Sequence, residues 1–264
     1  MVNMATKTIR VTRARMGEEN EELEDEIAVD EAICLFVNME HFRILVASPV
    51  MIRELAVGHL FSEGVINGLE EVEKVEIGTG KVYIDLKKDV DLGSFNEYRR
   101  EIITTACGAP IMGSVEEGLQ LLRVTSTLTV EVKRILEMVS RLNQKDTVFR
   151  RTGGTHIAML CDSEANTLAF SEDVGRHNAV DKVIGYALLN NIQLDQCVLI
   201  SSGRQSGEMV LKAAHSGVPI VASVSAPIES GRKVAEETGV TLIGFVRGSR
   251  MNIVTHPKRI IVAN

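Results

Sequence analysis

From about residue 100 onward the chain alternates short apolar runs with stretches of helical periodicity, and this alternation restricts the fold more than any other feature. Apolar runs bounded by turn residues are typical of strands buried on both faces of a sheet. Strands that alternate with helices predict a three-layer α/β domain with a largely parallel sheet. The clearest segments, in chain order, are HIAMLC, TLAFSE, NAVDKVIGYALLNN, CVLISSG, GEMVLKAAHSG, IVASVSA, GRKVAEETG and LIGFVR.

The preceding part of the chain predicts a smaller α+β unit. The apolar runs EAICLFVN and HFRILVAS are separated only by Met39 and Glu40, which is typical of a β-hairpin, and GTG joins VEKVEI to KVYIDL in a second one. Between the hairpins, apolar residues recur at helical spacing after Pro49, and Gly64 suits the end of that helix. Residues 17–26 are almost all acidic or polar and predict a solvated loop or a charged turn.

The pattern changes between Leu92 and Thr104, and we place the domain boundary there. This divides the chain into an N-terminal α+β domain, residues 1–100, and an α/β domain, residues 101–264, which carries the candidate site segments. At 264 residues, the chain is long enough for one or two domains and a sizeable core.

Composition excludes several classes of function. The formal net charge of −7 gives no bulk attraction to nucleic acid. No apolar stretch reaches the roughly 18 residues that a membrane helix needs, and the N-terminus lacks the apolar run of a signal peptide. We therefore expect a cytoplasmic protein that binds neither nucleic acid nor membranes.

The cysteines are few and far apart, with no CxxC pair, which argues against a zinc site and a disulfide framework. Cys34, Cys161 and Cys197 lie in or beside apolar runs and read as small apolar residues of buried strands. Cys107 is the exception, because it lies in the stretch TTACGAP among small residues, a glycine and a proline.

Two segments that follow predicted strands suit an anion. Ligands of open α/β sheets gather at the carboxyl ends of the strands. In SSGRQSGEM, a Ser/Gly turn before a helix exposes backbone N–H groups, and Arg204 adds a cation beside Ser202. The alternative is that Ser206 only caps the helix and Gly203 only makes the turn. SVSAPIESGRK, which contains Ser225, repeats both interpretations.

Three further segments are rich in groups that contact ligands. EDVGRHNAVDK gathers charged residues at a helix start, where Asn178 suits the cap but Arg176 and His177 have no structural explanation. In FVRGSRMN, arginines flank a Gly-Ser turn, and their planar forks match phosphate oxygens while the phenylalanine offers a stacking surface; a solvated loop is the alternative. In RTGGTHIAM, His156 is either a ligand contact or a satisfied structural histidine.

Motifs of several enzyme classes are absent from the sequence. There is no GxxxxGK[ST], no GxGxxG after a strand and no GxSxG elbow. A zinc deaminase would need HxE and PCxxC, and neither occurs.

Taken in order, the segments resemble the FdhD family of sulfur-carrier proteins that formate dehydrogenase requires for activity. The resemblance covers most of the chain and rests on ELAVGHLFSEGVI, TTACGAP, RTGGTHIAM, EDVGRHNAVDKVIG, SSGRQSGEMVLKAAHSGVPIVASVSAP and LIGFVRGSRMNIVTHPKRI. It implies a cytidine-deaminase-like three-layer α/β core without that fold's zinc site, no bound metal ion, and a homodimer.

The resemblance also implies a chemistry. Family members are sulfurtransferases that accept sulfur from a cysteine desulfurase as a cysteine persulfide and pass it to the molybdenum bis(molybdopterin guanine dinucleotide) cofactor of formate dehydrogenase. The family's persulfide cysteine matches Cys107, in a loop whose small residues allow reach. The residues expected to contact this guanine-nucleotide-type ligand are Phe245, Val246, Arg247, Gly248, Ser249 and Arg250, with Arg176, His177, Ser202, Arg204 and Ser225.

The sequence departs from the family at one point. Many members carry CxxC in this loop, whereas here the second position is Pro110, which excludes a disulfide or relay between two loop cysteines. Transfer through Cys107 alone survives this change. The second hypothesis is therefore a chaperone that holds the cofactor or docks on the apo-enzyme without moving sulfur. A deaminase-like hydrolase is a third, and it lacks metal ligands.

Overall fold

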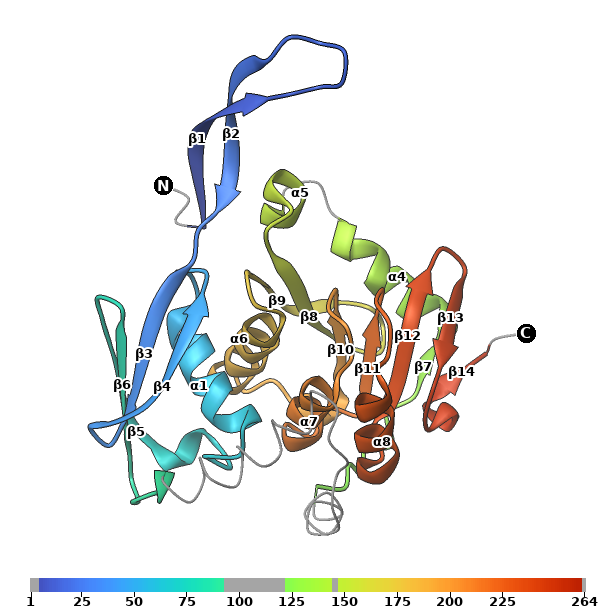
Figure 1. Cartoon of the computed structure of the whole chain (residues 1–264). Helices are drawn as coiled ribbons and strands as arrows, with labels where there is room; N and C mark the ends of the chain where they lie inside the picture. Colours follow the sequence, from blue (N-terminus) through green and yellow to red (C-terminus); the bar gives the residue numbers. More distant parts are fainter. Residues whose placement is uncertain (1–4, 93–121, 144–146, 263–264) are drawn as a thin grey trace.

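A six-stranded mixed sheet forms the centre of the C-terminal part of the protein (Figure 1). The computed structural model describes residues 5–92, 122–143 and 147–262. The sheet order is β13-β12-β11-β10-β8-β9. Its strands are β8 (His156–Cys161), β9 (Thr167–Asp173), β10 (Val198–Ser201), β11 (Ile220–Ser223), β12 (Thr241–Arg247) and β13 (Arg250–Ile253).

Only the three central strands of this sheet are parallel. β10 pairs parallel with β11, and β11 with β12, whereas β8, β9 and β13 join the sheet antiparallel. The expectation of a largely parallel sheet was wrong for the outer strands. The links β8–β9 and β12–β13 are short turns, and a parallel pair needs a crossover of a dozen or more residues.

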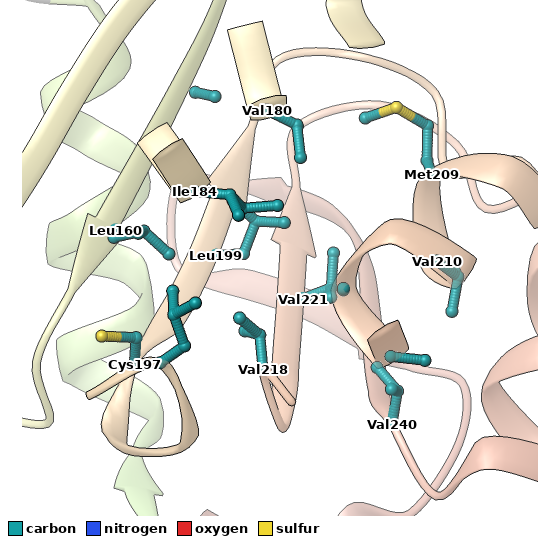
Figure 2. Packing of buried hydrophobic residues seen from close by; sticks show 14 of the residues in the cluster. Leu160, Val180, Ile184, Cys197, Leu199, Met209, Val210, Val218, Val221 and Val240 are labelled. Atoms are coloured by element: carbon teal, nitrogen blue, oxygen red, sulfur yellow. The ribbon is translucent and has the colours of Figure 1, made fainter. Parts of the chain in front are cut away.

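Helices cover both faces of the sheet, which confirms the three-layer α/β core (Figure 1). The face that packs against α6 (Arg176–Leu189), α7 (Gly207–His215) and α8 (Glu229–Thr238) contributes alternate residues such as Leu199, Val221 and Leu242 to one apolar cluster (Figure 2). The opposite face contributes Ile200, Ala222 and Ile243 to a second cluster with α4 (Val132–Ser140). Each cluster follows from the alternation of side chains along a strand.

The N-terminal unit has its own four-stranded sheet, in the order β4-β3-β6-β5. Both predicted hairpins are confirmed, and in the first one Asn38 and Met39 have positive φ angles, as a tight two-residue turn requires. Gly64, at φ +79°, follows the last turn of the predicted helix, α1. The elements are β3 (Glu31–Val37), β4 (Glu40–Ala47), α1 (Ile52–Ser62), β5 (Val72–Gly78) and β6 (Lys81–Leu86).

A two-stranded ribbon stands apart from both sheets at the N-terminus (Figure 1). It consists of β1 (Thr6–Arg13) and β2 (Glu21–Ala28), paired antiparallel along their whole length. The expectation that residues 17–26 form only a loop or turn was wrong, because their acidic second half is strand β2. Glutamates opposite arginines and threonines across the ribbon make that strand possible despite its charge.

The two parts meet where α1 crosses α6 at backbone contact. A Cβ built on Gly58 would lie 1.8 Å from the carbonyl oxygen of Asp181, and one on Gly185 would lie 1.9 Å from that of Glu54. Glycine is therefore required at both positions. The boundary proposed near residue 100 lies outside the described residues and stays a prediction.

The remaining described elements are short. Among the helices of the described ranges, none is long and apolar enough to cross a membrane. The short elements are η1 (Leu69–Glu71), β7 (Val130–Glu131), η2 (Arg141–Asn143), α5 (Val148–Thr152), η3 (Leu194–Gln196), η4 (Pro257–Arg259) and β14 (Ile260–Ile261).

Candidate functional site

One edge of the six-stranded sheet collects most of the predicted site residues. The parallel strands β10, β11 and β12 all end there, and β8 begins there because it runs antiparallel to β10 (Figure 1). The backbone N–H of Ser202, just past β10, donates to the carbonyl of Ile157 at 3.0 Å. This places His156, the first residue of β8, beside the loop that follows β10.

Hydrogen bonds tie the loops at this edge together. The Oγ of Ser202 accepts from the N–H of Ile157 at 2.9 Å and lies 3.3 Å from Nδ1 of His156. The hydroxyl of Ser225 donates to the carbonyl of Ser202 at 2.8 Å, linking the loop after β11 to the loop after β10. Both serines predicted as ligand contacts therefore have a structural role, and their oxygens retain capacity for one further bond.

A β-bulge at the end of β12 turns Phe245 toward this edge. The pairing of β12 with β13 shifts between Gly244 and Arg247, and Phe245 has a φ of +53°. Such a conformation is uncommon for a bulky residue and occurs at functional sites. The N–H of Phe245 donates to the carbonyl of Ser225 at 3.0 Å, and 39% of its surface is exposed. Val246 instead points into the core, so only its backbone can meet a ligand.

Arg247 supplies positive charge beside the exposed ring, and Arg176 supplies it beside Gly203 and His156. The guanidinium carbon of Arg247 lies 5.9 Å from the centroid of Phe245, and its Nε donates to the carbonyl of Val224 at 3.3 Å. Arg176 is the first residue of α6, and its side chain passes against Gly203, where an added Cβ would lie 3.0 Å from the Cβ of Arg176. Its Nε is buried and has no hydrogen-bond partner among the described residues.

The loop between β10 and α7 contains further buried polar atoms without partners. Gln205 is fully buried, and within the described part of the chain neither its amide oxygen nor its amide nitrogen has a hydrogen-bond partner. Ser206 takes the cap position of α7, but its hydroxyl makes no capping bond, and the N–H of Gly207 donates to Ser230 instead. Ser206 therefore occupies the cap position as predicted, but its hydroxyl does not make the hydrogen bond of a helix cap. No sequence pattern points to Gln205, since a glutamine beside an arginine is not a distinctive motif.

The EDVGRHNAVDK segment has a structural explanation for most of its polar residues. Asp173 accepts hydrogen bonds from the N–H groups of Ser48 and Gly175, from Lys182 and from the side chain of Asn178. Asn178 does not cap α6, which begins two residues earlier, and it donates to the carbonyl of Val46 as well. These bonds join α6 to the N-terminal sheet.

The other predicted contacts are more open. Nε2 of His177 lies 3.5 Å from Oε2 of Glu208, and both side chains are partly exposed. The side chain of Arg204 is exposed, as are the predicted contacts Gly248 and Ser249, in the turn after β12, and Arg250, the first residue of β13. Burial, followed by the charge of Arg176, lowers the pKa of His156, so its imidazole is neutral near pH 7. We call His156, Arg176, Ser202, Ser225, Phe245 and Arg247 the strand-end surface.

Comparison with known proteins decides the family. A family model described as the FdhD/NarQ family matches residues 28–261. The chain belongs to the FdhD/NarQ family. Proteins named sulfur carrier protein FdhD are 38% identical to it in Bacillus pumilus, over 89% of this chain and 90% of the relative, and 36% identical in Bacillus subtilis, over 98% and 99%. The protein of that name in Sulfolobus acidocaldarius is 34% identical, over 97% and 99%.

A solved structure supports the fold of this FdhD/NarQ family member. It is a crystal structure from Desulfotalea psychrophila, described as a formate dehydrogenase accessory protein. The two structures superpose with a TM-score of 0.78, at 22% sequence identity, over 97% of this chain and 100% of the other. The likeness shows that the α/β arrangement is shared.

Two of the three described cysteines, Cys161 and Cys197, are buried as the sequence predicted, whereas Cys34 is only partly buried. Cys161 and Cys197 are buried, and burial raises the pKa of Cys161 to about 11 and that of Cys197 to about 12. Such thiols are not nucleophilic near neutral pH. Cys34 is half-buried in β3. Cys107, the candidate for the persulfide in this family member, lies outside the described residues, as does Pro110.

A second buried network, which no sequence pattern predicted, joins α1, α6 and α7. Lys212 donates to both carboxylate oxygens of Asp181, at 2.8 and 3.0 Å, and to Glu63 at 2.5 Å. Burial would raise the pKa of Asp181, but the charge of Lys212 and the hydrogen bond from His59 outweigh it and hold it far below its usual value. The three segments are distant in sequence, so no local pattern reveals the network.

Proposed function

We propose that this chain is a sulfur carrier for formate dehydrogenase, acting in the cytoplasm as a homodimer. Cys107 accepts sulfur from a cysteine desulfurase, and the strand-end surface holds a guanine nucleotide of the molybdenum bis(molybdopterin guanine dinucleotide) cofactor, which is the substrate. Family membership and the names of the relatives support the sulfur-carrier role. The solved structure from Desulfotalea psychrophila is described as a formate dehydrogenase accessory protein, which supports formate dehydrogenase as the enzyme that receives the sulfur.

The arrangement around Phe245 is the observation that most directly supports nucleotide binding. The backbone of Phe245 has a positive φ at a β-bulge, its ring is exposed, and the guanidinium carbon of Arg247 lies 5.9 Å from the ring centroid. An aromatic face can stack on any base, and arginine forks match phosphate oxygens. The buried, unpartnered Nε of Arg176 fits an anion that completes its hydrogen bonds.

The neighbouring groups fit the same ligand. The neutral imidazole of His156 and the hydroxyl of Ser202 each retain hydrogen-bonding capacity at this edge. Arg204, in the loop after β10, and Arg250, the first residue of β13, are exposed and add positive charge. Ligands of open α/β sheets bind at this end of the strands.

The sulfur step needs only one cysteine of this chain. The Cys107 thiolate attacks the terminal sulfur of the desulfurase persulfide, so one S–S bond forms on Cys107, another breaks, and the desulfurase cysteine leaves as a thiolate. In the transfer to the cofactor, Mo(IV) gives two electrons to that sulfur, which becomes a sulfido ligand of Mo(VI). The S–S bond to Cys107 breaks, and Cys107 returns to a thiolate. Neither step uses a second loop cysteine, so Pro110 in that position removes no reacting group.

Intact-protein mass spectrometry with thiol mapping tests the sulfur step. We expect the protein, incubated with a cysteine desulfurase and free cysteine, to gain one sulfur atom on Cys107, and this sulfur to be lost on reduction. Cys107→Ser should abolish the gain, whereas Cys34→Ser, the matched control, should retain it. A plain thiol at Cys107 beside an active desulfurase would favour the second candidate, a cofactor-binding chaperone; that candidate also predicts that Cys107→Ser still matures formate dehydrogenase.

Calorimetric titration with GDP tests the nucleotide site separately. We expect binding by the wild-type protein and a loss of about tenfold or more in Arg176→Gln, because one charged hydrogen bond to phosphate contributes roughly 1.5–3 kcal/mol. Arg134→Gln is the matched control, since Arg134 lies on α4 and pairs with Glu164 away from the strand-end surface. Equal affinities for the two variants would remove the strand-end surface from the proposal.

A further inference from the structure

One face of the β1–β2 ribbon carries an apolar stripe. Residues directly opposite across an antiparallel pair share a face, so four pairs form this face, and the two central ones contain Ile9, Val11 and Leu23. Ile27 extends the stripe toward the base of the ribbon and is 43% exposed. We call this the ribbon face; its pairs are Lys7–Ile27, Ile9–Asp25, Val11–Leu23 and Arg13–Glu21.

The ribbon contacts α5 through its opposite face. β2 packs against α5, where Arg151 pairs with Glu26 at 2.9 Å and Gly154 approaches Ala28. Glu26 and Ala28 alternate with the residues of the ribbon face and so point the other way. The ribbon projects from the same side of the molecule as the carboxyl ends of β10–β12 (Figure 1). An isolated two-stranded ribbon is marginally stable in water, so packing of its apolar face against another layer would stabilise it.

Charge along the ribbon face is self-complementary. Lys7, at the base, takes part in no ion pair within the described ranges. Glu21, near the tip, is an exposed anion 3.6 Å from Arg15. The remaining charges of the ribbon face are Arg13, near the tip, and Asp25, in the central pair with Ile9, and they pair with each other at 3.3 Å. A second ribbon laid tip to base would therefore bring Lys7 of one copy to Glu21 of the other, twice in a two-fold arrangement.

We propose that the ribbon face is the surface on which a second copy of this chain packs, with the two ribbons face to face and tip to base. The two-fold axis then passes between the Ile9 and Val11 levels, so that Ile9 of each copy contacts Val11 and Leu23 of the other. The paired stripes form a small apolar layer, as stacked sheets do. The inference deepens the homodimer of the proposed function by naming its surface, and it does not depend on the sulfur chemistry.

Sedimentation-equilibrium measurements on matched variants of the full chain test the proposal. Val11→Lys places a charge in the centre of the ribbon face, and Thr12→Lys places the same charge on the next residue, which points to the opposite face beside Glu22. We expect a dimer for the wild-type protein and Thr12→Lys. For Val11→Lys we expect the dimer dissociation constant to rise about 100-fold or more, because the interface would bury unpaired charges.

A charge-reversal pair tests the orientation. Lys7→Glu and Glu21→Lys should each weaken the dimer, by about tenfold, and the double variant should restore it because the ion pair is reversed. A monomeric wild-type protein, or equal dissociation constants for Val11→Lys and Thr12→Lys, would overturn the inference, and so would a double variant weaker than either single one. Desulfurase-dependent sulfur loading of Cys107 in Val11→Lys separates this result from the sulfur-carrier proposal, since loading should persist in a monomer.

Discussion

The Nδ1 of His59, on α1, lies 2.9 Å from Oδ2 of Asp181, on α6, and both side chains are buried. The bond assigns the imidazole proton to Nδ1 and leaves Nε2 buried, with no partner in the ranges that the structure describes. Lys212 and Ser62 complete the hydrogen bonds of the same carboxylate. The neutral histidine thus orients an anion that links the N-terminal unit to the core.

Stability should fall in mild acid because of His59. Burial lowers its pKa from 6.5 to about 4, although Asp181 opposes the shift. The unfolded chain therefore takes up this proton below about pH 6.5, and the folded chain only near pH 4. The free energy of unfolding should decline between these values, by up to on the order of 3 kcal/mol. Urea unfolding from pH 7 to pH 4.5 measures it.

The variant His59→Asn isolates this contribution. An asparagine amide can donate to Asp181 in place of Nδ1, but it does not titrate. We expect lower stability at pH 7, because ring packing against Phe42 is lost, and a flatter profile between pH 6.5 and pH 4.5. A profile as steep as that of the wild-type protein would show that other groups cause the acid loss. Asp181, whose pKa is depressed, contributes only below about pH 4.

The buried ion pair of Lys182 and Asp173 should be costly to break from one side. Nζ of Lys182 lies 2.5 Å from Oδ2 of Asp173 and 2.9 Å from the carbonyl oxygen of Ser48, and both side chains are inaccessible. Lys182→Met should destabilise the protein by about 3–5 kcal/mol, because it leaves the carboxylate without its cation. The double variant with Asp173→Asn should cost less than the sum of the single variants. Strict additivity in urea unfolding would contradict this coupling.

The α1–α6 crossing should tolerate no added carbon. A methyl group on Gly58 or Gly185 would overlap backbone atoms of the facing helix, which cannot move aside as a side chain can. We expect Gly58→Ala and Gly185→Ala each to lower the free energy of unfolding by about 3 kcal/mol or more. Gly78→Ala is the control, since its added Cβ would meet only the carbonyl oxygen of Lys81 at 3.8 Å. A loss as small as the control's would show that the helices separate easily.

Local patterns predicted the fold where neighbouring residues determine the structure. The β3–β4 and β5–β6 hairpins, the end of α1 at Gly64 and the helices of the core follow from periodicity and turn chemistry. The predicted direction of the strands at the sheet edges was wrong, because strand direction depends on which strands pair in space. The charged strand β2 was missed, because its pairing with β1 stabilises it and its own composition does not.

The candidate site divides in the same way. The sequence identified the loops at the strand ends, since those loops combine glycine, serine and arginine in patterns that suit an anion. The sequence did not show which polar residues of EDVGRHNAVDK are structural and which belong to the site. Asp173, Asn178 and Lys182 tie α6 to the N-terminal sheet, whereas Arg176 is part of the strand-end surface. The bulge that turns Phe245 outward is also invisible in sequence, because it arises from a register shift between two strands.

Phe245 should show a conflict between stability and binding. Its φ of +53° is strained for a side chain with a Cβ, whereas glycine adopts it freely. Phe245→Gly should therefore leave the melting temperature unchanged or raise it. The same change should weaken GDP binding by about tenfold or more, since base–aromatic stacking contributes roughly 1–3 kcal/mol. Thermal unfolding and calorimetric titration of one preparation give both values.

Phe245→Tyr is the matched control for that pair of measurements, because it keeps both the strained backbone and the aromatic face. We expect it to bind GDP within about twofold of the wild-type protein and to melt at the wild-type temperature. If Phe245→Gly bound GDP as tightly as Phe245→Tyr, the exposed ring would not be a stacking surface. If Phe245→Gly melted well below the wild-type protein, the ring would stabilise the bulge through its contact with Arg247, and the strain would have a structural explanation.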